Sequence, residues 1–128
     1  MKLLPGIDLV AIDDVREALR AHGDTYLQRV FTPGEVVDAG GPEQPDIGAL
    51  AQIMAAKEAV AKSLRSEDDS LPWRTIEVRQ LPSGALEIGL TGAAAALAER
   101  RGLDGFSVAT TMEGDVAAAF VVAGHEPR

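Results

Sequence analysis

The segment QIMAAKEAVAKSL, residues 52–64, lies within the longest element that the sequence predicts, a helix over about residues 46–65. The segment is mostly apolar and rich in alanine, a composition that favours a helix packed closely against its neighbours. Glu58 follows Met54 by four residues and precedes Ala61 by three, so it lies on a largely apolar face. A buried carboxylate is costly unless something pairs with it. The sequence therefore leaves open whether a lysine, a metal ion or only water pairs with Glu58.

Two partners for Glu58 are compatible with the residues alone. Lys62 follows by one helical turn, so the two can form an i,i+4 salt bridge, which is a common pairing that contributes little to stability. Alternatively, Glu58 meets Asp8, which follows a buried strand, although Asp8 can also serve as a simple strand-end turn or cap. Two carboxylates from separate elements suit Mg²⁺, because that ion commonly takes one or two carboxylates with waters and phosphates. Lys62, and Lys57 from a neighbouring face, could then contact phosphate or assist proton transfer.

The composition limits the class of protein. A chain of 128 residues predicts one domain, residues 1–128, whose small core would benefit from oligomerisation. The net charge of −8 argues against a nucleic-acid surface, which needs a basic patch, and against binding to an anionic membrane. No apolar run approaches the roughly 20 residues of a spanning helix, and the charge at Asp8 comes too early for a signal peptide. We therefore expect a cytoplasmic protein.

The other predicted elements alternate between strands and helices. Gly23 should bend or interrupt a helix over residues 13–30. Thr32, Pro33 and Glu35 supply an N-cap, a first-turn proline and a capping-box glutamate for a short helix. The remaining expected elements are strands over residues 3–10, 75–80, 86–90, 106–112 and 116–122, and a helix from Thr91 to Gly102. This order predicts an α+β fold in which helices cover one side of a largely antiparallel sheet.

Five short motifs, in this order, resemble one known family. They are GIDLV at residues 6–10, FTPGE at 31–35, AAKEAVAK at 55–62, LTG at 90–92 and EGD at 113–115. Their order and spacing are similar to those of the bacterial holo-acyl-carrier-protein synthases, which are small 4′-phosphopantetheinyl transferases. The resemblance covers nearly the whole chain. It implies Mg²⁺-dependent transfer of the phosphopantetheine arm of coenzyme A to a serine of an acyl carrier protein, with release of adenosine 3′,5′-bisphosphate.

The same resemblance implies an assembly and roles for individual residues. Small members of the family form homotrimers with active sites between subunits. Asp8 and Glu58 match the family's metal ligands, and Glu58 and Lys62 match catalytic positions. Lys57, Lys62 and Gly84 match positions that bind coenzyme A.

Several positions depart from the family pattern, and they cluster on the side expected to bind coenzyme A. Ile53 and Met54 stand where the family has an arginine and an aromatic residue, and Leu86 replaces the proline of a Gly-x-Pro turn. Ala109 and Met112 replace a serine and a histidine. Because these side chains carry no charge, they weaken the transferase interpretation unless another subunit supplies the missing groups. The alternatives are that Ile53, Met54 and Met112 are core residues and that the chain is a diverged binding or scaffold subunit, or hosts another reaction.

The first predicted helix offers a candidate surface for the carrier protein. Acyl carrier proteins are acidic, and Arg16 and Arg20 lie on one face at i,i+4 spacing. Asp13, Asp14 and Glu17 are interleaved with them, however. The alternative is therefore a solvated helix whose charges pair with each other.

Overall fold

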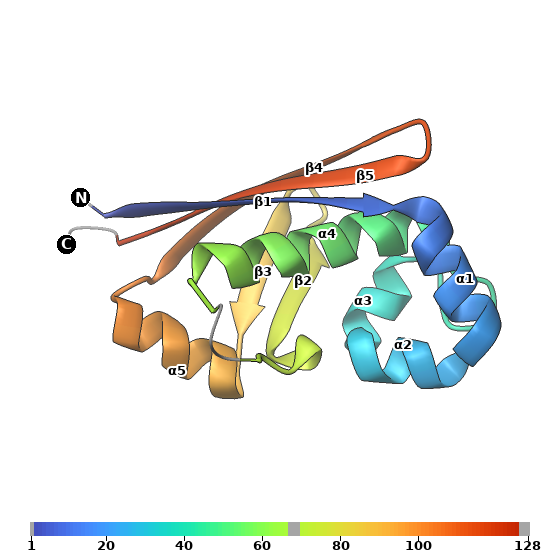
Figure 1. The fold of residues 1–128 in the computed structure, drawn as a ribbon, viewed down its shortest axis with the longest axis horizontal. Coiled ribbons are helices and arrows are strands. Elements are labelled where there is room, and N and C mark those ends of the chain that lie inside the picture. Colours follow the sequence, from blue (N-terminus) through green and yellow to red (C-terminus); the bar gives the residue numbers. More distant parts are fainter. Residues whose placement is uncertain (1, 67–69, 126–128) are drawn as a thin grey trace.

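The chain forms an α+β fold built around one central helix (Figure 1). The computed structural model describes residues 2–66 and 70–125. Strands β1 (Leu3–Ala11), β5 (Val116–Gly124) and β4 (Gly105–Glu113) form an antiparallel sheet in that order, and β2 (Ile76–Gln80) pairs with β3 (Leu86–Leu90) in a separate hairpin. The helices are α1 (Ile12–His22), α2 (Asp24–Val30), α3 (Pro33–Asp38), α4 (Ile47–Ser63) and α5 (Gly92–Arg101), with a 3₁₀ turn η1 (Trp73–Thr75) before β2. The predicted fold class is confirmed, but the strands divide between two sheets.

Two local predictions about the first helices are confirmed. Gly23 separates α1 from α2 with a φ of +52°, a conformation that costs glycine little because it has no Cβ. Thr32 begins α3 with a complete capping box. Its hydroxyl oxygen accepts from the Glu35 backbone N–H at 3.2 Å, while the Glu35 carboxylate accepts from the Thr32 N–H at 2.8 Å. The cap leaves the Glu35 side chain at a fixed place in the interior.

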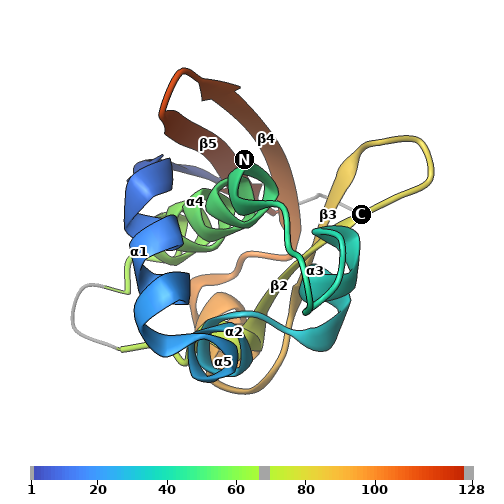
Figure 2. The same cartoon turned by 90° about the vertical axis from the view of Figure 1, so that its right-hand side faces the viewer.

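Helix α4 is buried on several faces, which explains its apolar composition. It packs beneath β1 and β5 on one side and against the hairpin on another (Figures 1 and 2). The apolar residues of α4 with no exposed surface are Leu50, Ala51, Ala55, Ala56, Ala59 and Val60. The many alanines keep the helix thin, so that neighbouring elements can approach its backbone.

Gly6 is the point of closest approach between β1 and α4. A Cβ atom built at this position would lie 2.0 Å from the Ala59 carbonyl oxygen. No side chain fits there, so glycine is required by contact rather than by backbone conformation. This contact fixes the distance between Asp8, two residues further along β1, and the side chains of α4.

The outer face of the three-stranded sheet is open and apolar. Leu3, Ile7 and Leu9 of β1 have exposed fractions of 57%, 61% and 68%, and Phe120 of β5 has 49%. In the register, Ile7 lies opposite Phe120, which lies opposite Ala109 of β4. The other face of the same sheet packs on α4, so no helix of the described chain covers the outer one (Figure 1).

None of the described helices combines the length and the hydropathy that a membrane-spanning helix requires.

Candidate active site

Asp8, Glu58 and Lys62 meet at the surface between β1 and α4. The Lys62 ammonium donates to Asp8 Oδ1 at 2.6 Å and to the Ile7 carbonyl oxygen at 3.1 Å. The Asp8 side chain is only 10% exposed, whereas that of Lys62 is 56% exposed. Together with Ala61, Ser66 and Trp73, the three residues line a cavity of about 410 Å³.

The two carboxylates of this cluster carry more negative charge than the lysine can balance. Lys62 forms its ion pair with Asp8 rather than with Glu58. Burial and, after it, the neighbouring carboxylate of Asp8 together raise the pKa of Glu58 to about 7, although Lys62 opposes the shift. Asp8 Oδ2 is buried and has no hydrogen-bond partner among the residues described. An unsatisfied carboxylate oxygen beside a second carboxylate is an arrangement that a divalent cation fits.

The protein side of such a metal site would be small. Across residues 2–66 and 70–125, no three or more His, Cys, Asp or Glu side chains are grouped so that they could hold a metal ion together. Two carboxylates alone match the way proteins bind Mg²⁺, which retains waters and takes further oxygens from substrate phosphates.

The structure places Lys57 away from this cluster. Its ammonium bonds Glu35 Oε1 at 2.6 Å, with neither side chain exposed, and lies 5.8 Å from the centre of the Phe31 ring. Burial raises the pKa of Glu35 and lowers that of Lys57, and their mutual attraction opposes both changes. Glu35 also accepts from the backbone N–H groups of Thr32 and Val78, each at 2.8 Å, and these hydrogen bonds oppose the effect of burial on its pKa. Lys57 therefore ties α4 to α3 and β2.

The carboxylates of α3 fasten the hairpin to the rest of the molecule. Glu35 accepts from Val78 N–H, and Asp38 accepts from Gln80 N–H at 3.0 Å and from Arg79 Nε at 2.9 Å. These backbone groups lie on the free edge of β2, where a further strand would otherwise bind. The sequence identified Glu35 only as a capping residue and gave no role to Asp38. One signal in the sequence could have identified these two residues. Glu35 and Asp38 are acids at i,i+3 spacing on a helix too short to offer them a basic partner, so their partners must come from another element.

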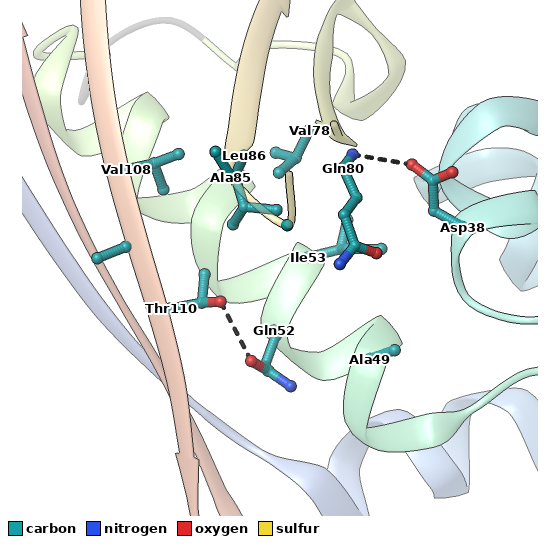
Figure 3. A pocket seen from close by; sticks show the side chains of 12 residues that line it. Asp38, Ala49, Gln52, Ile53, Val78, Gln80, Ala85, Leu86, Val108 and Thr110 are labelled. Atoms are coloured by element: carbon teal, nitrogen blue, oxygen red, sulfur yellow. Dashed lines mark hydrogen bonds between the residues drawn. The ribbon is translucent and has the colours of Figure 1, made fainter. Parts of the chain in front are cut away.

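A second cavity of about 460 Å³ lies between α4, the hairpin and β4 (Figure 3), and Gly84 is one of the residues that line it. Thr110 Oγ1 donates to Gln52 Oε1 at 3.1 Å across this cavity. Its described lining contains no lysine, arginine or histidine. The residues that line it are Asp38, Ala49, Gln52, Ile53, Val78, Gln80, Gly84, Ala85, Leu86, Val108, Ala109 and Thr110. The structure thus places Gly84 in one cavity with Ile53, Leu86 and Ala109, three of the positions that differ from the family pattern. This cavity is separate from Asp8 and Glu58.

Met112 lies elsewhere on β4, and the expectation that it is a core residue is wrong. It is 47% exposed, and its sulfur lies so close to α4 that a Cβ atom at Gly48 would be 2.7 Å from it. Ile53 does pack against the core, as its residue type predicted. Met54 is partly buried against the cluster formed by α1, α2 and α4.

Arg16 and Arg20 are exposed on α1 and pair within their own helix. Arg16 bonds Asp13, and Arg20 Nε donates to Glu17 Oε2 at 3.1 Å. This hydrogen bond from Arg20 holds the pKa of Glu17 below its usual value. In the isolated chain the two arginines are therefore largely neutralised.

Comparison with known proteins gives the family. The sequence model of the 4′-phosphopantetheinyl transferase superfamily matches residues 5–121. The holo-[acyl-carrier-protein] synthase of Desulforudis audaxviator is 37% identical over 118 residues, covering 92% of this chain and 89% of that protein. The synthase of Rhodopseudomonas palustris is 35% identical over 130 residues, covering 95% and 94%.

Solved structures agree with these sequence matches. The ACPS–CoA complex of Chronobacterium ammoniagenes superimposes with a TM-score of 0.84 at 27% identity and covers 99% of this chain and 100% of that one. The acyl carrier protein synthase of Mycobacterium tuberculosis is 35% identical with a TM-score of 0.69, covering 96% and 97%. By its fold, its sequence and the order of its motifs, the chain belongs to the 4′-phosphopantetheinyl transferase superfamily, and within it to the holo-[acyl-carrier-protein] synthases.

Proposed function

We propose that the protein transfers 4′-phosphopantetheine from coenzyme A to a serine of an acyl carrier protein. The observation that carries the proposal is the Asp8–Glu58 pair, with its unsatisfied Asp8 oxygen, beside Lys62 in one cavity. The relatives that match over most of the chain are named for this reaction, and one similar structure is a complex with coenzyme A.

Asp8 and Glu58 are the residues that would hold Mg²⁺. When bound, the ion would neutralise the charge of the diphosphate and of the leaving phosphate. Lys62 is placed to contact a substrate phosphate, because its exposed ammonium reaches the same cavity from α4. Glu58 and Lys62, which the resemblance implies as catalytic positions, both border this cavity, where they would be placed to accept the serine hydroxyl proton.

The proposed assembly is a homotrimer formed through the open face of the three-stranded sheet. The exposed Ile7, Leu9 and Phe120 give this face an apolar surface that water does not stabilise. Ala109 belongs both to that face and to the cavity of about 460 Å³, so a neighbouring subunit on the face would also border the cavity. A trimer can therefore supply groups that the Gly84 cavity lacks in one chain.

The proposed carrier surface is the exposed side of α1. Arg16 and Arg20 would exchange their partners on the same helix, Asp13 and Glu17, for acidic groups of the carrier. Lys57 and Gly84 were predicted from the family to bind coenzyme A. Gly84 stays in that role as part of the second cavity, whereas Lys57 supports the site from the core.

A second candidate function is a binding or scaffold subunit that has lost transfer activity. The observation in its favour is the lining of the second cavity, where Ile53, Leu86 and Ala109 offer no charge to a nucleotide. Both candidates require the same fold, so only an activity measurement separates them.

The experiment is incubation of the protein with coenzyme A, Mg²⁺ and an apo carrier protein, followed by mass measurement of the carrier. Transfer adds one phosphopantetheine group to the carrier, and a carrier whose acceptor serine is alanine is the control. A folded protein that leaves the carrier unmodified at millimolar coenzyme A contradicts the transferase proposal and supports the binding subunit.

A further inference from the structure

Glu58 lies between two cavities of the chain. One is the cavity of about 410 Å³ that it shares with Asp8 and Lys62. The other has a volume of about 310 Å³, and there Glu58 meets Asp14 of α1 and Tyr26 of α2. Because α1 packs beside α4 (Figure 2), this smaller cavity opens the Glu58 carboxylate toward the helix proposed to meet the carrier protein.

Tyr26 supplies the one hydrogen-bond donor among the described side chains that line the cavity of about 310 Å³. The other polar side chains there are the carboxylates of Asp14 and Glu58, which in the ionised form can only accept. The remaining lining residues are apolar, namely Leu9, Val10, Ala11, Val15, Ala18 and Met54. A hydroxyl group that enters this cavity can therefore donate its proton to Glu58 while its oxygen accepts from Tyr26.

The ring of Tyr26 is held in place, whereas its hydroxyl has no partner within the described chain. The ring packs edge-on against the buried Phe31, with 5.7 Å between the ring centres and 78° between the ring planes. None of the hydrogen bonds formed by residues 2–66 and 70–125 uses the Tyr26 hydroxyl. Burial, and after it the charge of Glu58, raises the pKa of Tyr26, so the hydroxyl keeps its proton at neutral pH. Tyr26 thus presents a donor whose position is fixed by its ring.

We propose that Tyr26 is a further catalytic residue, whose hydroxyl holds the acceptor serine of the carrier protein against Glu58. This inference rests on the proposed function and adds how the acceptor is held. The serine Oγ forms a bond to the phosphorus of coenzyme A that carries pantetheine, and the serine proton passes to Glu58. The bond from that phosphorus to the bridging diphosphate oxygen breaks, and adenosine 3′,5′-bisphosphate leaves with that oxygen. The Tyr26 O–H donates to Oγ throughout and stabilises the negative charge that develops on it.

The test compares Tyr26→Phe with wild type. Phenylalanine keeps the ring that packs on Phe31 and removes only the hydroxyl. Thr25→Val, which removes a hydroxyl from an exposed position of the same helix, is the matched control. Surface plasmon resonance measures the binding of each protein to two apo carriers, one with the acceptor serine and one with alanine in its place. Coenzyme A is left out of this measurement, so that no transfer occurs. Transfer rates are measured separately, by mass, with coenzyme A and Mg²⁺.

We expect wild type and Thr25→Val to bind the serine carrier more tightly than the alanine carrier. Tyr26→Phe should reduce this preference by about fivefold, the effect of one neutral hydrogen bond, and should bind the alanine carrier as wild type does. The unchanged binding of the alanine carrier also shows that the variant is folded. In the transfer assay, the kcat of Tyr26→Phe should fall at least about tenfold, because the hydrogen bond strengthens as charge develops on the serine oxygen. The KM for coenzyme A and the affinity for Mg²⁺ should stay at their wild-type values.

A wild-type preference for the serine carrier in Tyr26→Phe overturns the inference, whatever the kcat of the variant. Equal weakening toward both carriers also overturns it, because Tyr26 would then contact a part of the carrier other than the serine. If wild type prefers the serine carrier, Tyr26→Phe loses that preference, and neither protein transfers phosphopantetheine, then the serine site stands and the proposed function fails.

Discussion

Glu58 is the residue whose charge decides how the site behaves without metal. Its pKa of about 7 in the folded protein lies above the ordinary value of 4.5 that applies when the chain is unfolded. The raised pKa therefore adds to the free energy of unfolding. This contribution is complete below about pH 4.5, and it is lost as the pH rises through 7. A bound divalent ion would remove the loss, because it favours the ionised carboxylate.

The prediction for Glu58 uses Glu58→Gln with thermal unfolding in EDTA and in Mg²⁺. In EDTA, the free energy of unfolding should fall between pH 5 and pH 8 by on the order of 1 kcal/mol more in the wild type than in the variant. This figure allows for the partial exposure of Glu58. Mg²⁺ should restore the stability of the wild type at pH 8 and leave the stability of the variant unchanged. Magnesium binding by Glu58→Gln equal to that of wild type in calorimetry would show that Glu58 is not a ligand.

Lys57 and Glu35 give a second prediction at the residue scale. Lys57→Met leaves the Glu35 carboxylate buried without its counter-ion, so the free energy of unfolding should fall by about 3–5 kcal/mol. Lys62→Met, which removes a half-exposed ammonium from Asp8, should cost less than Lys57→Met and serves as the comparison. Similar losses in the two variants, measured by urea unfolding, would contradict the structural role given to Lys57.

The sequence predicted which residues matter at the site better than it predicted their pairing. Asp8, Glu58 and Lys62 were expected together, and the structure brings them together. The partner of Lys62 could not be predicted, because i,i+4 spacing favours Glu58 while the strand brings Asp8 closer. Lys57 was expected to reach the same site from a neighbouring face of the helix. Successive helical residues point in directions about 100° apart, and only the position of α3 shows that Lys57 points to the core.

At the scale of elements, the contact between β1 and α4 holds the site together. Gly6→Ala would place a methyl group 2.0 Å from the Ala59 carbonyl oxygen, so β1 must move away from the helix. We expect a loss of at least roughly 2 kcal/mol in the free energy of unfolding, together with weaker Mg²⁺ binding because Asp8 moves with its strand.

Gly89→Ala is the matched control for this prediction. Gly89 also lies in a strand, and no atom lies within 4 Å of the place its Cβ would take. That variant should change stability by less than about 1 kcal/mol and leave Mg²⁺ binding intact. Urea unfolding and calorimetry of both variants measure the difference, and equal behaviour would mean that the close approach at Gly6 is not what positions Asp8.

Local signals predicted most of these elements. The capping box at Thr32, the glycine break at Gly23 and the alternation in β2 depend on neighbouring residues, so the sequence contains them. The division into two sheets does not follow from such signals. The binding of the β2 edge by the carboxylates of Glu35 and Asp38 does not follow from them either, because it is a contact between elements far apart in the chain.

At the scale of the whole molecule, the open sheet face predicts the oligomeric state. Phe120→Glu places a charge in the middle of the apolar face, opposite Ile7. Light scattering at micromolar concentration should give a trimer for wild type and a smaller species for the variant, because a charge buried there without a partner is costly. Glu87→Gln, on the hairpin, is the control. A wild-type monomer that transfers phosphopantetheine at full rate would contradict the proposed assembly.

The charge of the whole molecule bears on the carrier interface. With a net charge of −8, the protein should repel an acidic carrier except where Arg16 and Arg20 face it. The double variant Arg16→Glu, Arg20→Glu should therefore slow association markedly, and wild-type association should weaken as salt rises. Reversal of Arg100 alone is the control. Surface plasmon resonance that gives the same association rate for wild type and the double variant would place the interface elsewhere.

The bond between Lys62 and Asp8 has a consequence for which ions the site accepts. The Lys62 ammonium is a monovalent cation that is covalently attached to the chain and already pairs with the Asp8 carboxylate. Its effective concentration there is higher than free sodium or potassium reaches. A monovalent ion gains nothing by displacing it, whereas a doubly charged ion gains the attraction of both Asp8 and Glu58. At the proposed metal site, the lysine would therefore discriminate between ions by valence. Magnesium affinity measured in potassium chloride and in choline chloride at equal ionic strength should therefore be the same.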